Sequence, residues 1–110
     1  MGMGEAGGYW LDRLRSEARG ADPKVLAEWS EIIEGKANVR LKDAFVKIKF
    51  EVSVDENSKF KLDMDAATPE SILCLLKAIQ GCLELMPSTT KTFYAALMES
   101  LASEAEKRDP

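Results

Sequence analysis

The chain has 110 residues, of which 45% are hydrophobic and 31% are charged, and its formal net charge is -4. This size and balance are typical of one compact globular domain and exclude a disordered chain. The sequence contains no histidine, which excludes Ser-His and Cys-His catalysis and every zinc site that needs imidazole. The acidic balance also argues against a nucleic-acid partner, because a phosphate-binding surface would oppose the net charge.

The two ends of the chain are expected to lie outside the folded domain. Residues 1–8 are rich in glycine and lack the basic start and apolar stretch of a signal peptide, so we expect a flexible arm. Residues 107–110 are expected to be a frayed tail, which leaves 9–106 as a single α+β domain. No run of 18 apolar residues occurs, so we expect a soluble, cytoplasmic protein with no membrane partner.

Two helices are predicted in the first part of the domain. Residues 9–19 have a weak helical pattern, and Asp22 and Pro23 then form a start signal, because Asp caps free amides and Pro at the first helical position loses no hydrogen bond. The second helix is expected to end at about Glu34, with Gly35 as its stop. Its apolar stripe consists of Val25, Leu26, Trp29, Ile32 and Ile33.

Between residues 38 and 66 the apolar period changes from 3.6 to 2, which indicates an antiparallel β-hairpin with one buried face. A three-residue loop over 55–57 places Glu51 opposite Lys61, whereas a longer loop sets Glu51 against Asp63, so we predict the shorter loop. This register pairs Val52 with Phe60, Phe50 with Leu62, Ile48 with Met64, Lys49 with Asp63 and Lys47 with Asp65.

Two further helices are predicted after the hairpin. Thr68 and Pro69 repeat the capping signal and begin a strongly apolar helix, which we expect to be the central core helix. Pro87 interrupts the chain before a fourth, amphipathic helix. The fold class is therefore α+β, with two N-terminal helices, a central antiparallel β-hairpin, and two C-terminal helices packed on one face of the sheet.

The charged side chains of the hairpin suggest two kinds of site. Lysines on its wet face could form a nucleic-acid patch, but residues 39–66 contain six basic and six acidic residues, which favours a solvated ion-pair face. The carboxylates could hold a cation, but their spacing does not match a calcium loop. We predict no metal. The residues concerned are Lys47, Lys49, Lys59 and Lys61, and Asp55, Glu56, Asp63 and Asp65.

The remaining candidates are hydroxyl, thiol and aromatic side chains. Ser88, Thr89 and Thr90 could hold an anion at a helix start, but capping explains them and no phosphate-binding loop accompanies them. Cys74 and Cys82 are eight residues apart on one helix, about 12 Å, which is too far for a disulfide. We predict that both are buried structural thiols.

The aromatic residues could form a binding surface, although two of them fall within apolar stripes. Trp29 and Phe93 are assigned to the core on that ground, and Tyr94 adjoins Phe93. Trp10 lies in a short, mostly polar helix, so its exposure would mark a contact site.

These patterns contain no catalytic set and no cofactor-binding motif. We therefore expect a non-enzymatic protein-interaction module, such as an adaptor, a chaperone-like protein or a regulatory subunit. The alternative is a carrier of an apolar small molecule, with a pocket between the sheet and the C-terminal helices.

The hairpin also predicts a homodimer. Its first strand could run from about Lys42 to Asp55, while the partner strand from Ser58 to Ala66 covers only the later part, so the residues before Val46 lack a neighbour. A second copy could satisfy an open edge by antiparallel pairing. The alternative is a monomer in which residues 39–44 fold back as a third strand.

Overall fold

The computed structural model describes residues 12–42, 47–57, 60–65 and 68–108. A helical segment over residues 12–19 precedes the labelled elements. These are α2 (Pro23–Arg40), β1 (Lys49–Val54), β2 (Phe60–Asp65), α3 (Pro69–Leu83) and α4 (Ser88–Arg108).

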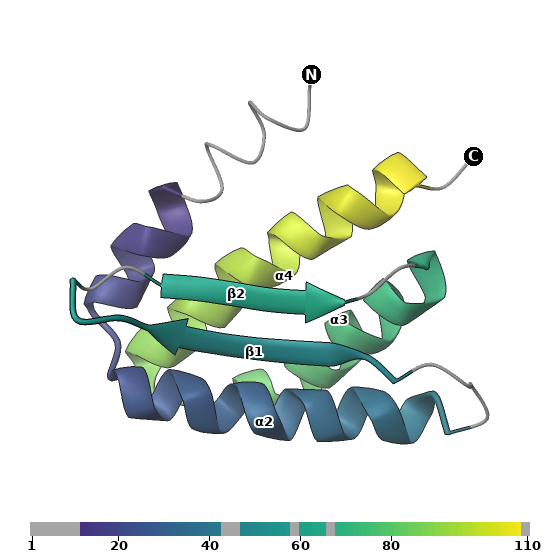
Figure 1. Ribbon diagram of the computed structural model, residues 1–110, viewed down its shortest axis with the longest axis horizontal. Helices are drawn as coiled ribbons and strands as arrows, with labels where there is room; N and C mark the ends of the chain where they lie inside the picture. The colour runs from purple at the N-terminus through teal and green to yellow at the C-terminus, as the bar shows by residue number, and fades with distance from the viewer. Residues whose placement is uncertain (1–11, 43–46, 58–59, 66–67, 109–110) are drawn as a thin grey trace.

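The predicted α+β fold class is confirmed. β1 and β2 form a two-stranded antiparallel sheet, α3 and α4 lie behind it, and α2 runs alongside β1 (Figure 1). The expected arm over 1–8 and Trp10 lie outside the described residues. Helix α4 continues to Arg108, past the predicted end of the domain at residue 106.

Helix α2 does not stop at Gly35, so the predicted end at Glu34 is wrong. A Cβ added at Gly35 would meet no atom within 4 Å, and Ala37 in the next turn is fully buried. Burial of this turn offsets the roughly 1 kcal/mol that glycine costs inside a helix. Val39, expected to lie in a strand-like segment, is therefore helical, and Leu41 is the C-cap.

The strand register differs from the prediction by two residues. Val54 lies opposite Phe60 and Glu51 lies opposite Asp63, so the longer loop that the sequence disfavoured is the one present. The charge argument failed because Lys49 reaches diagonally to Asp63, with Nζ 3.0 Å from Oδ2. Long side chains can satisfy diagonal as well as direct neighbours, so the ion pair does not discriminate between the two registers.

The strand overhang that suggested a dimer is also absent from the described residues. β1 begins at Lys49 instead of Lys42, and its six residues match the six of β2. Residues 39–40 are helical and 41–42 form a turn, so the folded-back third strand is wrong there, while 43–46 lie outside the description.

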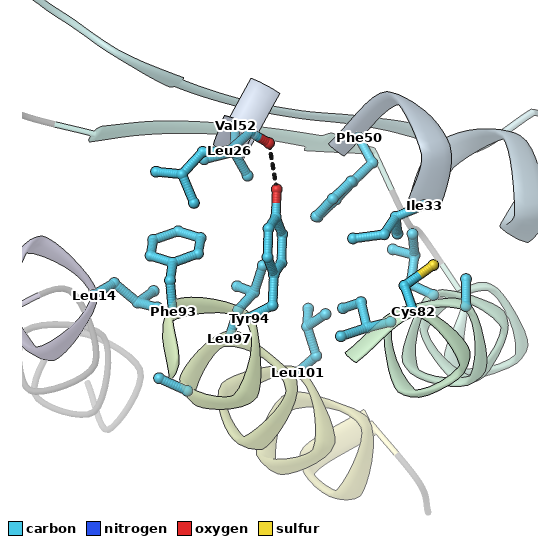
Figure 2. Close-up of a cluster of buried hydrophobic side chains, with 14 of the residues drawn as sticks. Leu14, Leu26, Ile33, Phe50, Val52, Cys82, Phe93, Tyr94, Leu97 and Leu101 are labelled. Carbon is cyan, nitrogen blue, oxygen red and sulfur yellow. Dashed lines mark hydrogen bonds between the residues drawn. The ribbon is translucent and has the colours of Figure 1, made fainter. Parts of the chain in front are cut away.

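The core lies between the inner face of the hairpin and the helices. Phe50 and Val52 point from β1 toward Tyr94 and Leu97 of α4, and all four are buried (Figure 2). The Phe93 ring stacks edge-to-face on Phe60, with centroids 5.7 Å apart. This continuous core holds the helices to one face of the sheet and leaves the other face exposed.

Candidate functional site

The two outer edges of the hairpin differ, and this difference defines the candidate site. On β1, α2 covers the edge: Asn38 Nδ2 donates to the Ile48 carbonyl oxygen at 3.0 Å, and Ile48 N–H donates to Asn38 Oδ1 at 2.8 Å. Two residues further on, Phe50 N–H donates to Glu34 Oε2 at 2.9 Å. These side chains satisfy main-chain groups that a third strand would otherwise use.

Among the residues that the structure describes, none covers the outer edge of β2 in this way. Because Phe50 N–H points away from β2 and Phe50 lies opposite Met64, the main-chain groups of Met64 point away from β1. The same alternation turns Phe60 and Leu62 outward. Within the described part of the chain, no hydrogen bond from outside the hairpin reaches the main chain of these three residues.

Along β2, apolar side chains lie on the core face of the sheet and charged side chains lie on the opposite face. Leu62 and Met64 share the core face but are only half-buried, whereas Phe60 is buried. Lys61 and Asp65 on the other face are exposed, and Asp63 is half-buried. A strand laid along this edge would therefore meet incompletely covered apolar residues on one side and alternating charges on the other.

The described lysines that were expected to form an ion-pair face lie on the surface. Lys47, Lys49 and Lys61 are exposed, and Lys59 lies outside the described residues. The hydrogen bond from Lys49 to Asp63 raises the pKa of that ammonium, and the charge of Asp63 adds to the effect. This pairing supports the prediction of an ion-pair face.

The acidic candidates do not gather into a metal-binding group. Asp55 and Glu56 are exposed beside the turn, and Asp63 is engaged with Lys49. Across the residues that the structure describes, no three cysteine or acidic side chains lie close enough together to hold a metal ion.

The hydroxyl candidates lie at the start of α4. That helix begins at Ser88, and Thr90 is buried. Thr92 donates its hydroxyl to the Ser88 carbonyl oxygen at 2.8 Å. Ser88, Thr89 and Thr90 therefore lie inside the first turn of α4 instead of capping it from outside, so the capping interpretation is not confirmed.

The two cysteines differ in burial. Cys82 is fully buried, and burial raises the pKa of its thiol, although the charge of Lys36 opposes this shift. Cys74 is half-buried, so the prediction that both are buried holds for Cys82 alone. Both thiols are free, as expected from their spacing.

The aromatic candidates are parts of the core. Phe93 and Tyr94 are fully buried, and Trp29 is partly buried against the core. The Tyr94 hydroxyl donates to the Leu26 carbonyl oxygen at 2.6 Å (Figure 2). These contacts exclude Phe93 and Tyr94 from a surface that binds a partner.

The space between the sheet and the C-terminal helices, where the carrier alternative requires a pocket, is filled by side chains. Phe50, Val52, Tyr94 and Leu97 occupy it and expose no more than 1% of their surface (Figure 2). This packing gives the carrier alternative no support.

Several hollows lie on the outside of the molecule, and none of them was predicted from the sequence. One of about 310 Å³ lies between α2 and β1 and is acidic, one of about 370 Å³ lies between α3 and α4 and is apolar, and one of about 330 Å³ lies between α2 and α3 and is basic. For the apolar and the basic hollow, an exposed apolar residue at a helical position was a signal in the sequence, whereas the lining of the acidic hollow contains no such residue. Leu73 and Val39, which are 49% and 70% exposed, line the apolar and the basic hollow.

No helix in the described part of the chain is both long enough and apolar enough to cross a bilayer. Comparisons with protein-family models, with curated proteins and with solved structures found no match to this chain.

Proposed function

We propose that this protein is a homodimeric, non-enzymatic protein-interaction module whose two copies pair through the outer edge of β2. The observation that carries the proposal is the asymmetry of the hairpin. Asn38 and Glu34 cover the β1 edge, while the main chain of Phe60, Leu62 and Met64 has no partner outside the hairpin among the described residues. An uncovered edge next to half-buried apolar side chains favours strand addition.

The sequence of β2 is complementary to itself in one antiparallel register. With the two-fold axis at Leu62, that residue faces its counterpart, and Phe60 of one copy faces Met64 of the other. On the exposed face, Lys61 of one copy then lies opposite Asp63 of the other, and the symmetry repeats this attraction. The main-chain groups that point outward are those that this register would hydrogen-bond.

Pairing of this kind would extend the two-stranded sheet to four strands. Two-stranded sheets are marginal alone, and three or more strands with an apolar face are stable. The proposed dimer also covers Leu62 and Met64, which the single chain leaves half-buried. Such a scaffold is compatible with an adaptor, chaperone-like or regulatory role, none of which needs a catalytic centre.

The absence of catalysis is part of the same proposal. Of the described groups with shifted pKa values, Cys82 and Tyr94 are buried by core packing and Lys49 is in a surface ion pair. Each shift therefore has a structural cause that involves no substrate.

The test is the molar mass in solution, measured by sedimentation or light scattering from low to high micromolar concentration. We expect a concentration-dependent rise to twice the mass of the chain. Lys61→Asp and Asp63→Lys each create symmetric like-charge pairs and should weaken the dimer about tenfold. An equimolar mixture of these two variants should restore dimerisation, because each introduced charge then faces an opposite charge on the other copy.

Lys47→Asp is the matched control, since it makes the same charge change on the exposed face outside β2. It should leave the dimer unchanged. Circular dichroism of each variant verifies that it folds. A constant single-chain mass for the natural sequence would contradict the proposal, as would a mixture no more dimeric than its separate components.

A further inference from the structure

The hollow between α2 and α3 is lined by residues of both helices. Lys36, Val39 and Arg40 come from α2, and Lys77, Ala78 and Gly81 come from α3. Half of these residues are cationic and none is acidic, although the whole chain has a net charge of -4. The hollow is thus a local region of positive charge on an acidic protein.

The three cations are not neutralised by neighbours within the described part of the chain. The ion pairs found there join Arg13 with Glu99, Arg15 with Asp12, and Lys49 with Asp63, and so involve none of the cations of the hollow. Lys36, Arg40 and Lys77 are all exposed. Three positive groups around one opening therefore remain available to an anion from solution.

Small residues on α3 keep this hollow open. Ala78 is 1% exposed and forms part of the core surface, while Gly81 one turn later is exposed. A Cβ at Gly81 would meet no atom within 4 Å, so neighbouring packing does not require glycine there. The missing side chain leaves room above the helix, and the exposed Val39 adds an apolar wall.

The chemistry of the lining selects a class of ligand. A guanidinium can hold two oxygens of a phosphate at once, and the two ammonium groups act as further point charges. A dianion matches this set better than a carboxylate, which carries one charge. The exposed Val39 provides a contact for a small apolar substituent, and a volume of about 330 Å³ suits a compact ligand.

We propose that the hollow between α2 and α3 is a binding site for a small phosphate monoester that carries an apolar group. This site is separate from the β2 edge and does not depend on the homodimer.

The experiment uses the full chain and three probes of similar shape. Phenyl phosphate, benzoate and phenol are titrated at low salt while amide chemical shifts are followed by NMR. We expect saturable shifts with phenyl phosphate at a dissociation constant of about 1 mM, weaker binding of benzoate and none of phenol. The shifts should centre on residues 36–40 and 77–81.

Substitutions locate the site. Lys36→Gln, Arg40→Gln and Lys77→Gln should each weaken the binding of phenyl phosphate about threefold to tenfold. Lys91→Gln, an equal charge change at an exposed position on α4 outside the hollow, should have no effect.

Two glycine substitutions form a matched pair. Gly81→Leu fills the hollow, whereas Gly35→Leu makes the same change at an open helical position that does not line it. Both should raise the midpoint of thermal unfolding, since leucine favours helix more than glycine does, but only Gly81→Leu should abolish binding. The proposal is overturned if phenyl phosphate gives no saturable shifts up to about 10 mM, if benzoate binds equally well, or if the variants of the lining bind like Lys91→Gln.

Discussion

Asn38 in the last turn of α2 and Ile48 just before β1 hold each other through two hydrogen bonds, at 3.0 Å and 2.8 Å. The side-chain amide of Asn38 takes the place of a neighbouring peptide unit, because it donates to the carbonyl oxygen and accepts from the N–H of one residue. Helix α2 thereby covers the β1 edge, whereas no residue in the described ranges covers the edge of β2.

Replacing Asn38 tests this relationship. Asn38→Ala should lower the free energy of unfolding by about 2 kcal/mol, because the N–H and the carbonyl of Ile48 then lose their partners. Ile48 is 3% exposed, so water replaces these bonds poorly. Urea denaturation measures the change, with Glu31→Ala on the exposed side of α2 as the control. Equal stability of the two variants would show that the two hydrogen bonds contribute little.

Tyr94 predicts a loss of stability in alkali. Burial raises the pKa of its hydroxyl, with a smaller opposing effect from the neighbouring Ser30 hydroxyl. The unfolded chain loses this proton at about pH 10 while the folded protein retains it, so the stabilisation is complete below that pH and declines as the pH rises further.

Tyr94→Phe should remove most of this alkaline decline. It should also cost about 1 kcal/mol at neutral pH, because the bond to the Leu26 carbonyl is lost. Urea denaturation of both proteins at pH 7 and at about pH 11 measures the cost of the substitution at neutral pH and the loss of stability in alkali. A decline of the same slope in the variant would assign the alkaline instability to other groups, of which Lys49, with its raised pKa, is one.

The Lys49–Asp63 ion pair should contribute a small, salt-dependent stabilisation. The Lys49 side chain is 61% exposed and that of Asp63 is 46% exposed, so ions in solution reach the pair and screen it. Lys49→Gln should therefore lower the unfolding midpoint at low salt and have no effect at about 1 M salt. A deficit that persists at high salt would indicate a packing role for the lysine stem.

The register of β1 against β2 can be tested by NMR. Phe50 and Met64 form a pair without mutual main-chain hydrogen bonds, in which the two Hα atoms approach closely. An NMR contact between these two Hα atoms is expected. The register with the shorter loop would instead bring Phe50 beside Leu62.

Truncations along α3 should have graded effects. Ile79 is fully buried, so Ile79→Ala should cost about 2 to 5 kcal/mol. Leu76 is only partly buried, and Leu76→Ala should cost less than Ile79→Ala. Leu85, just after the end of α3, is 72% exposed, so Leu85→Ala is the control. It should change the free energy of unfolding by under about 0.5 kcal/mol. Equal losses at Leu76 and Ile79 would indicate that another surface covers Leu76 in solution, as in an oligomer.

Local signals in the sequence determined where two helices begin and which segments are strands. Asp22 accepts a hydrogen bond from Lys24 N–H, and Thr68 accepts one from Ser71 N–H, as the capping patterns predict. These bonds join residues two or three positions apart, so their energy is available to the isolated segment. The alternation of apolar residues in the hairpin also follows from the backbone period and fixed the face that Phe50 and Val52 turn to the core.

Only the tertiary structure decided where α2 ends, which strand register forms and which edge stays open. The turn after Gly35 is helical because Ala37 meets a core assembled from distant residues. The bonds from Phe50 N–H to Glu34 and from Tyr94 to Leu26 span 16 and 68 residues. The basic hollow likewise exists only where α2 and α3 meet. Contacts of this kind depend on how whole elements pack, and a local pattern does not contain that information.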